Sequence, residues 1–187
     1  MKLSDESICK RIETFGDQRL HIDPFSLAQV QPASYDVLLG PGFLTPVTLR
    51  EWPSAIDPRD LPEDLWDAVP GTELTLAPGA FALGATLECV EIPTDLSATL
   101  SGKSTLGRIG LAVHVTAGYI DPGFQGNITL ELWNHSPNPL RLTAGMRIGQ
   151  LSFDQLDRPA VEAYGSSVLG GSHYQRQVGP TPPRSLA

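Results

Sequence analysis

Alternation of apolar and polar residues with a period of two predicts that most regular structure in this chain is β-strand. In segment 127–133 the even positions are apolar, whereas Thr129 and Glu131 occupy odd positions, so one face is suited to a core and the other to polar contacts. The strands expected from this pattern are 35–39, 73–76, 80–90, 98–100, 127–133 and 147–153.

A different pattern at the N-terminus predicts one short helix. Ser4 is a residue type that caps helix N-termini, and Gly16 is one that ends helices. Leu3 and Ile8 have the spacing of a hydrophobic staple, and Ile12 lies on the same helical face as Ile8. Helical periodicity is weak beyond this segment.

Turn-forming residues separate the expected strands at 78–79, 122–123 and 144–145. With 17 Pro and 18 Gly, the 187-residue chain favours many short strands over long helices. We therefore expect a mainly β, antiparallel, jelly-roll-like domain with short helices. Segment 57–67, rich in Pro and acidic residues, should be a surface excursion, and 165–187 a flexible tail.

The formal net charge of -8 argues against a protein that grips nucleic acid polymers along their phosphates, although a local basic cluster could still bind a nucleotide. Cys9 and Cys89 are the only cysteines, which suits a reducing compartment and offers no zinc framework. The N-terminus lacks the apolar run of a signal peptide, and the chain has no apolar stretch of 18 residues. We expect a soluble, cytoplasmic protein without a membrane partner.

Segment 101–108, SGKSTLGR, concentrates groups that bind phosphate. Lys103 and Arg108 supply charge, and Ser104 supplies a hydroxyl donor. It is not a P-loop, because Ser97 stands where that motif requires glycine. Taken alone, the segment could equally be a solvated polar turn that leads into a helix.

Two acidic residues further along allow both an ordinary and a chemical interpretation. Glu131 could point from its strand into water or act as a buried general acid/base, and Asp121 could be a simple turn residue before Pro122. His114, in an apolar stretch, fits a core or interface residue better than a ligand. The signature of zinc-dependent nucleobase deaminases is absent from the sequence, as are the common hydrolase and dinucleotide motifs.

Taken together, these segments resemble the dCTP deaminase family. The resemblance runs from the opening MKLSD, through QPASYDV at 31–37 and the 101–131 block, to Tyr174 and Gln177. It implies a homotrimer of distorted jelly-roll-like β-barrels of the trimeric dUTPase type, with active sites at subunit interfaces. It also implies a nucleotide-binding β domain over 1–164 and a tail over 165–187 that completes the site.

The resemblance implies specific roles for residues of this chain. Glu131 matches the catalytic acid/base, with Ser104 and Arg108 at the reaction centre, and Asp121 matches the residue that holds the deoxyribose. The substrate would be dCTP, with Mg²⁺ carried on its triphosphate and no zinc bound by the protein. The positions implied to contact the nucleotide are Lys103, Ser104, Thr105, Leu106, Gly107, Arg108, Asp121, Thr129, Leu130, Glu131, Gln150, Tyr164, His173 and Gln177.

The identity of the product depends on the pair Ala117-Gly118. Monofunctional relatives, which release dUTP, place a bulkier pair here, so a small pair resembles the bifunctional branch that forms dUMP, and Gly118 would leave room for water near the α-phosphate. His173 stands where relatives have a tail lysine, which puts the tail's contribution to affinity in question. A monofunctional deaminase, a non-catalytic nucleotide sensor and a structural jelly-roll protein remain alternatives.

Overall fold

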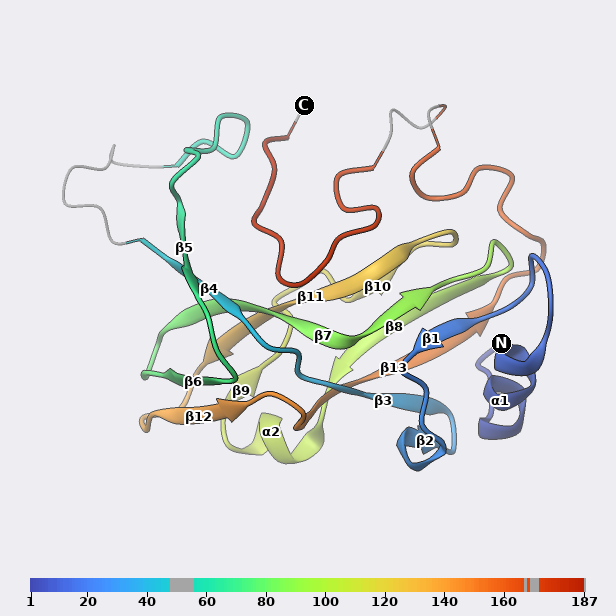
Figure 1. Cartoon of the computed structure of the whole chain (residues 1–187), viewed down its shortest axis with the longest axis horizontal. Helices are drawn as coiled ribbons and strands as arrows, with labels where there is room; N and C mark the ends of the chain where they lie inside the picture. Colours follow the sequence, from blue (N-terminus) through green and yellow to red (C-terminus); the bar gives the residue numbers. More distant parts are fainter. Residues whose placement is uncertain (48–55, 167, 169–171, 187) are drawn as a thin grey trace.

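Two antiparallel sheets form the body of the protein (Figure 1). The structure, a computed structural model, describes residues 1–47, 56–166, 168 and 172–186. In one sheet the strand order is β5 (Trp66–Val69), β4 (Phe43–Pro46), β7 (Phe81–Glu91), β11 (Gln125–Asn134) and β9 (Leu111–Ala112), and β1 (His21–Asp23) also pairs with β7. In the other it is β10 (Tyr119–Ile120), β8 (Leu96–Gly102), β13 (Arg147–Gln155), β3 (Ser34–Leu38) and β2 (Val30–Gln31), and β12 (Leu140–Thr143) pairs with β6 (Glu73–Leu76) in a small ribbon.

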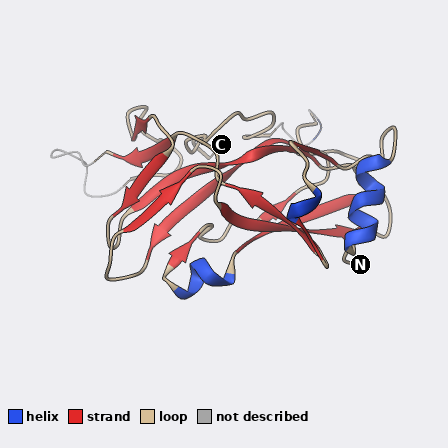
Figure 2. Cartoon of the chain, turned by 60° about the horizontal axis from the view of Figure 1, so that its bottom comes forward, coloured by secondary structure: helices blue, strands red, loops and turns tan. Residues whose placement is uncertain are grey.

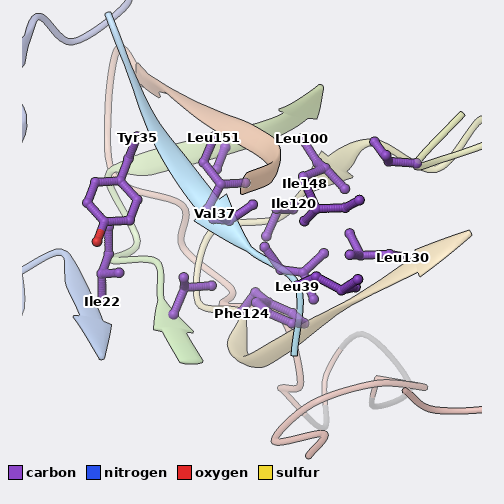
Figure 3. Packing of buried hydrophobic residues seen from close by; sticks show 14 of the residues in the cluster. Ile22, Tyr35, Val37, Leu39, Leu100, Ile120, Phe124, Leu130, Ile148 and Leu151 are labelled. Carbon is purple, nitrogen blue, oxygen red and sulfur yellow. The ribbon is translucent and has the colours of Figure 1, made fainter. Parts of the chain in front are cut away.

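The core lies between the two main sheets. Figure 3 shows Val37, Leu100 and Leu151 from the second sheet packed with Leu130 from β11, and each of these side chains is at most 1% exposed. Burial of one such side chain stabilises the fold by about 1.5–3 kcal/mol. The alternation in β11 therefore fixes which face carries polar groups, because a one-residue slip would bring Glu131 into this core.

Two α-helices lie apart from each other, α1 at one end of the molecule and α2 near the middle of its lower side (Figure 2). In α1 (Asp5–Glu13), the Ser7 amide donates to the Ser4 hydroxyl at 3.4 Å, which confirms the expected N-cap. The helix ends at Glu13 with Thr14 as its C-cap, so the expected stop at Gly16 is wrong, and Gly16, which has a positive φ of 79°, belongs to the following turn. The second helix, α2 (Ser104–Arg108), follows β8 directly, and a short 3-10 helix (Leu27–Gln29) precedes β2.

All six expected strands are present, and three of them, β8, β11 and β13, are longer than the sequence pattern predicts. The expected excursion is wrong at its end, because Trp66 begins strand β5 and pairs with Pro46. The sequence also misses the short strands β1, β2, β4, β5, β9, β10 and β12. In the described part of the chain, no helix is long and apolar enough to cross a membrane. The mainly β, jelly-roll-type fold is confirmed.

The C-terminal tail runs back along β11 of its own chain (red in Figure 1). Gln177 forms a parallel bridge with Gly126, and its carbonyl accepts from the Asn127 amide at 3.1 Å. Near its end, the Leu186 amide donates to the Pro58 carbonyl at 2.9 Å, and the Leu61 amide donates to the Ser185 hydroxyl at 3.1 Å. The tail is therefore held at two separated points. Residues 167, 169–171 and 187 of the expected tail lie outside the described residues.

Candidate active site

A cavity of about 420 Å³ lies between the outer face of β11 and the C-terminal tail. Its wall combines apolar side chains from β5 and β7 with polar side chains from β11 and the preceding loop. An apolar cavity with a few convergent polar groups is the usual form of a small-molecule site. Six of the residues expected from the sequence line it: Ala117, Asp121, Thr129, Glu131, Tyr164 and Gln177.

Strand pairing places Glu131 in the floor of this cavity. Glu131 lies opposite Leu83 of β7, so the two side chains share the outer face of the sheet. The Val115 amide donates to Glu131 Oε2 at 2.5 Å, and this contact holds the half-buried carboxylate in one orientation. Its other oxygen is free of protein partners among the described residues, which is the arrangement that a general acid/base requires.

Thr129 links the floor of the cavity to the tail above it. Its hydroxyl donates to Gln177 Oε1 at 3.4 Å and accepts from the Thr181 amide at 3.2 Å. Gln177 Nε2 in turn donates to the Asn127 carbonyl at 2.6 Å. Tyr174 and Pro183 also line the cavity from the tail, so this segment forms a roof over Glu131.

Tyr164 and Asp121 form the polar side of the cavity. The Tyr164 amide donates to the Pro122 carbonyl at 2.8 Å, and its ring packs on Phe124 with centroids 5.9 Å apart. Burial is the main cause that raises the pKa of the Tyr164 phenol, and the negative charge of Asp121 adds to it. The phenol is therefore a neutral hydrogen-bond donor close to an exposed carboxylate, as suits a sugar hydroxyl or a phosphate oxygen.

The basic segment expected at the same site lies elsewhere in the single chain. Figures 1 and 2 both place α2 on the side of the sheets opposite the tail. Ser104, Thr105 and Arg108 are exposed there, and Lys103 precedes them at the helix N-terminus. None of the residues 103–108 lines the cavity, so one chain does not bring Arg108 and Glu131 together.

A second polar cluster surrounds the start of α2. Lys103 Nζ donates to Asp36 Oδ1 at 2.6 Å, and Arg147 Nη1 donates to Asp36 Oδ2 at 3.1 Å. Gln150 lies directly opposite Asp36 in the β13–β3 ladder, and Ser34 donates to its side-chain carbonyl at 3.4 Å. The expected nucleotide contacts Lys103 and Gln150 therefore belong to this cluster, not to the cavity.

Two residues expected to contact the nucleotide have buried side chains. Leu106 is 9% exposed and Leu130 is fully buried, and both belong to the hydrophobic core. Neither side chain is therefore available to a nucleotide within one chain. His173 is exposed beside Tyr174, with ring centroids 5.9 Å apart, and it does not line the cavity.

The structure shows a different reason for glycine at position 118 from the one expected from the sequence. A β-carbon at this position would lie 2.8 Å from the Leu100 carbonyl oxygen and 3.2 Å from the His114 ring. The Leu100 amide also donates to the Gly118 carbonyl at 2.7 Å, so the two segments are closely packed. Within one chain, this close packing is the observed reason for glycine at position 118, and room for water near an α-phosphate stays a prediction. His114 itself is half-buried, and its Nδ1 has no hydrogen-bond partner in the described part of the chain.

Sequence reasoning missed several residues of both regions. Trp66 and Phe81 form an aromatic end of the cavity, with ring centroids 5.9 Å apart. Trp66 was missed because it falls in segment 57–67, which was expected to be a surface excursion. Asp36 and Arg147 were missed because each looks like an ordinary strand residue. The described residues contain no group of three or more His, Cys, Asp or Glu side chains that could hold a metal ion.

A jelly-roll domain with an acidic, partly aromatic cavity and a separate cationic cluster defines a small-molecule site of the nucleotide-binding kind. A sequence model of the family described as dCTP deaminase-like matches residues 2–156. A protein named "dCTP deaminase, dUMP-forming" from Mycolicibacterium vanbaalenii is 50% identical over 99% of this chain and 96% of its own length. One with the same name from Bifidobacterium adolescentis is 45% identical over 99% of this chain and 94% of its own length. The chain therefore belongs to the dCTP deaminase-like family.

A solved structure agrees at the level of fold. The 2'-deoxycytidine 5'-triphosphate deaminase from Agrobacterium tumefaciens superposes with a TM-score of 0.59 at 23% sequence identity. The match covers 81% of this chain and 46% of that one, so this chain spans about half the length of that structure. At this identity, the likeness supports the two-sheet architecture.

Proposed function

We propose that this protein deaminates dCTP hydrolytically at cytosine C4 and also cleaves the triphosphate, giving dUMP, pyrophosphate and ammonia. The observation that carries the proposal is Glu131, held by the Val115 amide in the floor of a cavity whose polar side is Asp121 and Tyr164. The relatives named as dUMP-forming, 45–50% identical over nearly the whole chain, support the same reaction.

In the proposed mechanism, Glu131 takes a proton from water as the water oxygen adds to C4 of the ring. The proton passes to N3, and a second transfer to the amino group lets ammonia leave and the carbonyl of uracil form. A carboxylate at this position can perform both transfers, because general acid/base catalysis needs only one group within hydrogen-bond reach. Thr129 and Glu131 would contact the base, and Asp121 the deoxyribose.

We infer that the working enzyme is a homotrimer with sites shared between subunits. Ser104 and Arg108 stand on the opposite side of the chain from Glu131, so a second copy is the simplest source of these groups at the cavity. Cyclic symmetry would repeat the same contact three times and complete three sites. Lys103 and Gln150 would then meet the triphosphate from the neighbouring subunit.

The dUMP-forming outcome is favoured over release of dUTP. Ala117 lines the cavity, and the tight packing around Gly118 keeps the loop close to β8 without adding a side chain there. A second water would attack the α-phosphate in line with the departing pyrophosphate, whose charge Mg²⁺ and Lys103 would stabilise. The Mg²⁺ is part of the substrate complex, bound largely by phosphate oxygens.

The proposed chemistry uses no zinc, and the sequence lacks the ligand pattern of zinc deaminases. Elemental analysis of the purified protein checks this. One tightly bound zinc per chain, with activity lost on its removal, would contradict it. The proposed location is the cytoplasm, which two free cysteines fit.

The deciding experiment is to incubate the protein with Mg²⁺ and dCTP and to quantify nucleotides, pyrophosphate and ammonia. We expect dUMP, pyrophosphate and ammonia in equal amounts. Accumulation of dUTP without pyrophosphate would identify the monofunctional alternative. Binding of dCTP without ammonia release would identify a nucleotide sensor, and no binding would leave a structural role.

A further inference from the structure

Among the charged residues outside the cavity that pair with an expected nucleotide contact, Asp36 is the most deeply buried. Its side chain is 1% exposed, and each carboxylate oxygen accepts from a different cation, Lys103 at 2.6 Å and Arg147 at 3.1 Å. We refer to Asp36, Lys103 and Arg147 as the Asp36 cluster. These residues come from β3, the β8–α2 junction and the start of β13.

The backbone around Asp36 is itself held in place. Gln29 Nε2 donates to the Asp36 carbonyl at 2.8 Å and to Glu88 Oε1 at 2.6 Å. The Leu38 amide donates to Glu88 Oε2 at 3.0 Å. Because β3 is fixed on both sides of Asp36, the carboxylate is a rigid reference point for the two cations.

The cluster leaves positive charge available to a ligand. Two cations share one carboxylate, so one positive charge is in surplus. The Lys103 and Arg147 side chains are 26% and 47% exposed, so both reach solvent on their outer sides. An ammonium has three N–H donors, and Asp36 uses one, which leaves two for an anion.

Net stability is a weak explanation for this arrangement. A buried ion pair seldom stabilises a fold more than apolar residues of the same size would, and it is costly when one partner is lost. Holding a long side chain before a ligand arrives, in contrast, saves entropy at the moment of binding. A lysine needed to meet a triphosphate gains from being held in this way.

We propose that Asp36 is a positioning residue that holds the Lys103 ammonium in place for the triphosphate of the substrate, with Arg147 fixing the second carboxylate oxygen. Asp36 acts through Lys103 and does not touch the reacting atoms. The inference rests on the proposed function, because it assumes a triphosphate substrate. It also predicts that a simple polyphosphate anion binds at the same place.

The test is Asp36→Asn, which keeps the size of the side chain but loses the charge and turns an amide group towards one of the cations. Ordering one long side chain is equivalent to about two- to tenfold in affinity. The KM for dCTP should rise by that factor with kcat for ammonia release nearly unchanged, and the inhibition constant of inorganic tripolyphosphate should rise equally. The matched control is Asp154→Asn, which breaks the exposed Lys2–Asp154 pair and should change neither constant.

A double-mutant cycle shows whether Asp36 acts through Lys103. On a Lys103→Gln background, adding Asp36→Asn should change KM by less than about twofold, because the interaction is already lost. Equal effects on both backgrounds, a fall in kcat with KM unchanged, or no effect at all would overturn the inference. If Asp36→Asn does not fold, Arg147→Met is used in the same cycle. This substitution removes the donor to Asp36 Oδ2, and the rise in KM that it causes should likewise vanish on the Lys103→Gln background.

Failure of the proposed function gives a different result. If the unmodified protein releases no ammonia from dCTP, calorimetric binding of tripolyphosphate still reports on the Asp36 cluster, and the variants should weaken it by the same factors. If the unmodified protein turns over dCTP but tripolyphosphate does not compete, the proposed function stands and the role of Asp36 is overturned.

Discussion

Glu131→Gln separates chemistry from structure more cleanly than any other change in the cavity. Glutamine has the same number of heavy atoms, and its carbonyl oxygen can still accept from the Val115 amide that now donates to Glu131 at 2.5 Å. The strand position opposite Leu83 is unaffected. Only the carboxylate, the proposed proton acceptor, is lost.

The expected structural and catalytic effects differ in size. Replacing a charged acceptor by a neutral one in a half-buried contact costs about 1 kcal/mol of unfolding free energy, or roughly 2–4 °C in Tm for a chain of this length. Loss of a general acid/base lowers the rate by about 10²–10⁴-fold, which is roughly 3–5 kcal/mol of barrier at about 1.4 kcal/mol per factor of ten. The rate effect should therefore dominate.

The assay is ammonia release from Mg²⁺-dCTP at saturating and subsaturating concentrations, together with thermal unfolding of the same samples. Glu73→Gln is the control, because Glu73 is an exposed carboxylate on β6 that accepts only from Thr143 among the described residues. We expect kcat to fall for Glu131→Gln, and we expect both kcat and KM to stay unchanged for Glu73→Gln.

One result would refute the assignment of Glu131. If the variant keeps its Tm within a few degrees and still releases ammonia at the wild-type rate, the carboxylate is not the proton acceptor. A fall in rate that follows a large loss of Tm would instead show that the Val115 contact is structural, and rescue of activity at low temperature would then be expected.

Three further predictions concern the assembly, the loop and the buried acid. Light scattering at micromolar concentration should give three chains, and an active monomer would contradict shared sites. Gly118→Ala should cost about 1–3 kcal/mol in denaturant unfolding, because its β-carbon would lie 2.8 Å from the Leu100 carbonyl, and unchanged stability would contradict this packing. Burial is the main cause that raises the pKa of Glu88, so the folded state favours the protonated carboxyl. The contribution of Glu88 to the free energy of unfolding is therefore lost as pH rises above 4.5, the ordinary value of a Glu carboxyl. Denaturant unfolding between pH 4 and 8 should therefore show wild type losing stability relative to Glu88→Gln as pH rises, and a constant difference would contradict it.

The outward face of β11 could be predicted from the sequence because alternation with a period of two is a local property. It placed Thr129 and Glu131 together correctly, and Asp121 lies beside them because only a short turn separates β10 from β11. Strands β4 and β5 could not be predicted in this way. Trp66–Val69 has no alternation of apolar and polar residues, and it is a strand because β4 pairs with it.

The Asp36 cluster shows a different limit of sequence reasoning. Asp36 is separated by 67 residues from Lys103 and by 111 from Arg147, and no local pattern connects residues so far apart. Only the pairing of β13 with both β3 and β8 brings them together. A long-range contact of this kind follows from sheet order, which depends on the packing of the whole chain.

Because Glu131 and Arg108 lie far apart in one chain, sites shared between chains would have a consequence for activity that can be tested. If each chain supplies the carboxylate of one site and the cationic segment of another, a free chain has a base without its phosphate contacts and cannot hold dCTP productively. Mixing Glu131→Gln chains with Arg108→Gln chains should then restore some sites with both native groups, because the two defects fall in different halves. Recovery of ammonia release in the mixture, absent from either variant alone, would support shared sites. A mixture as inactive as its components, with subunit exchange demonstrated, would show that both groups act within one chain.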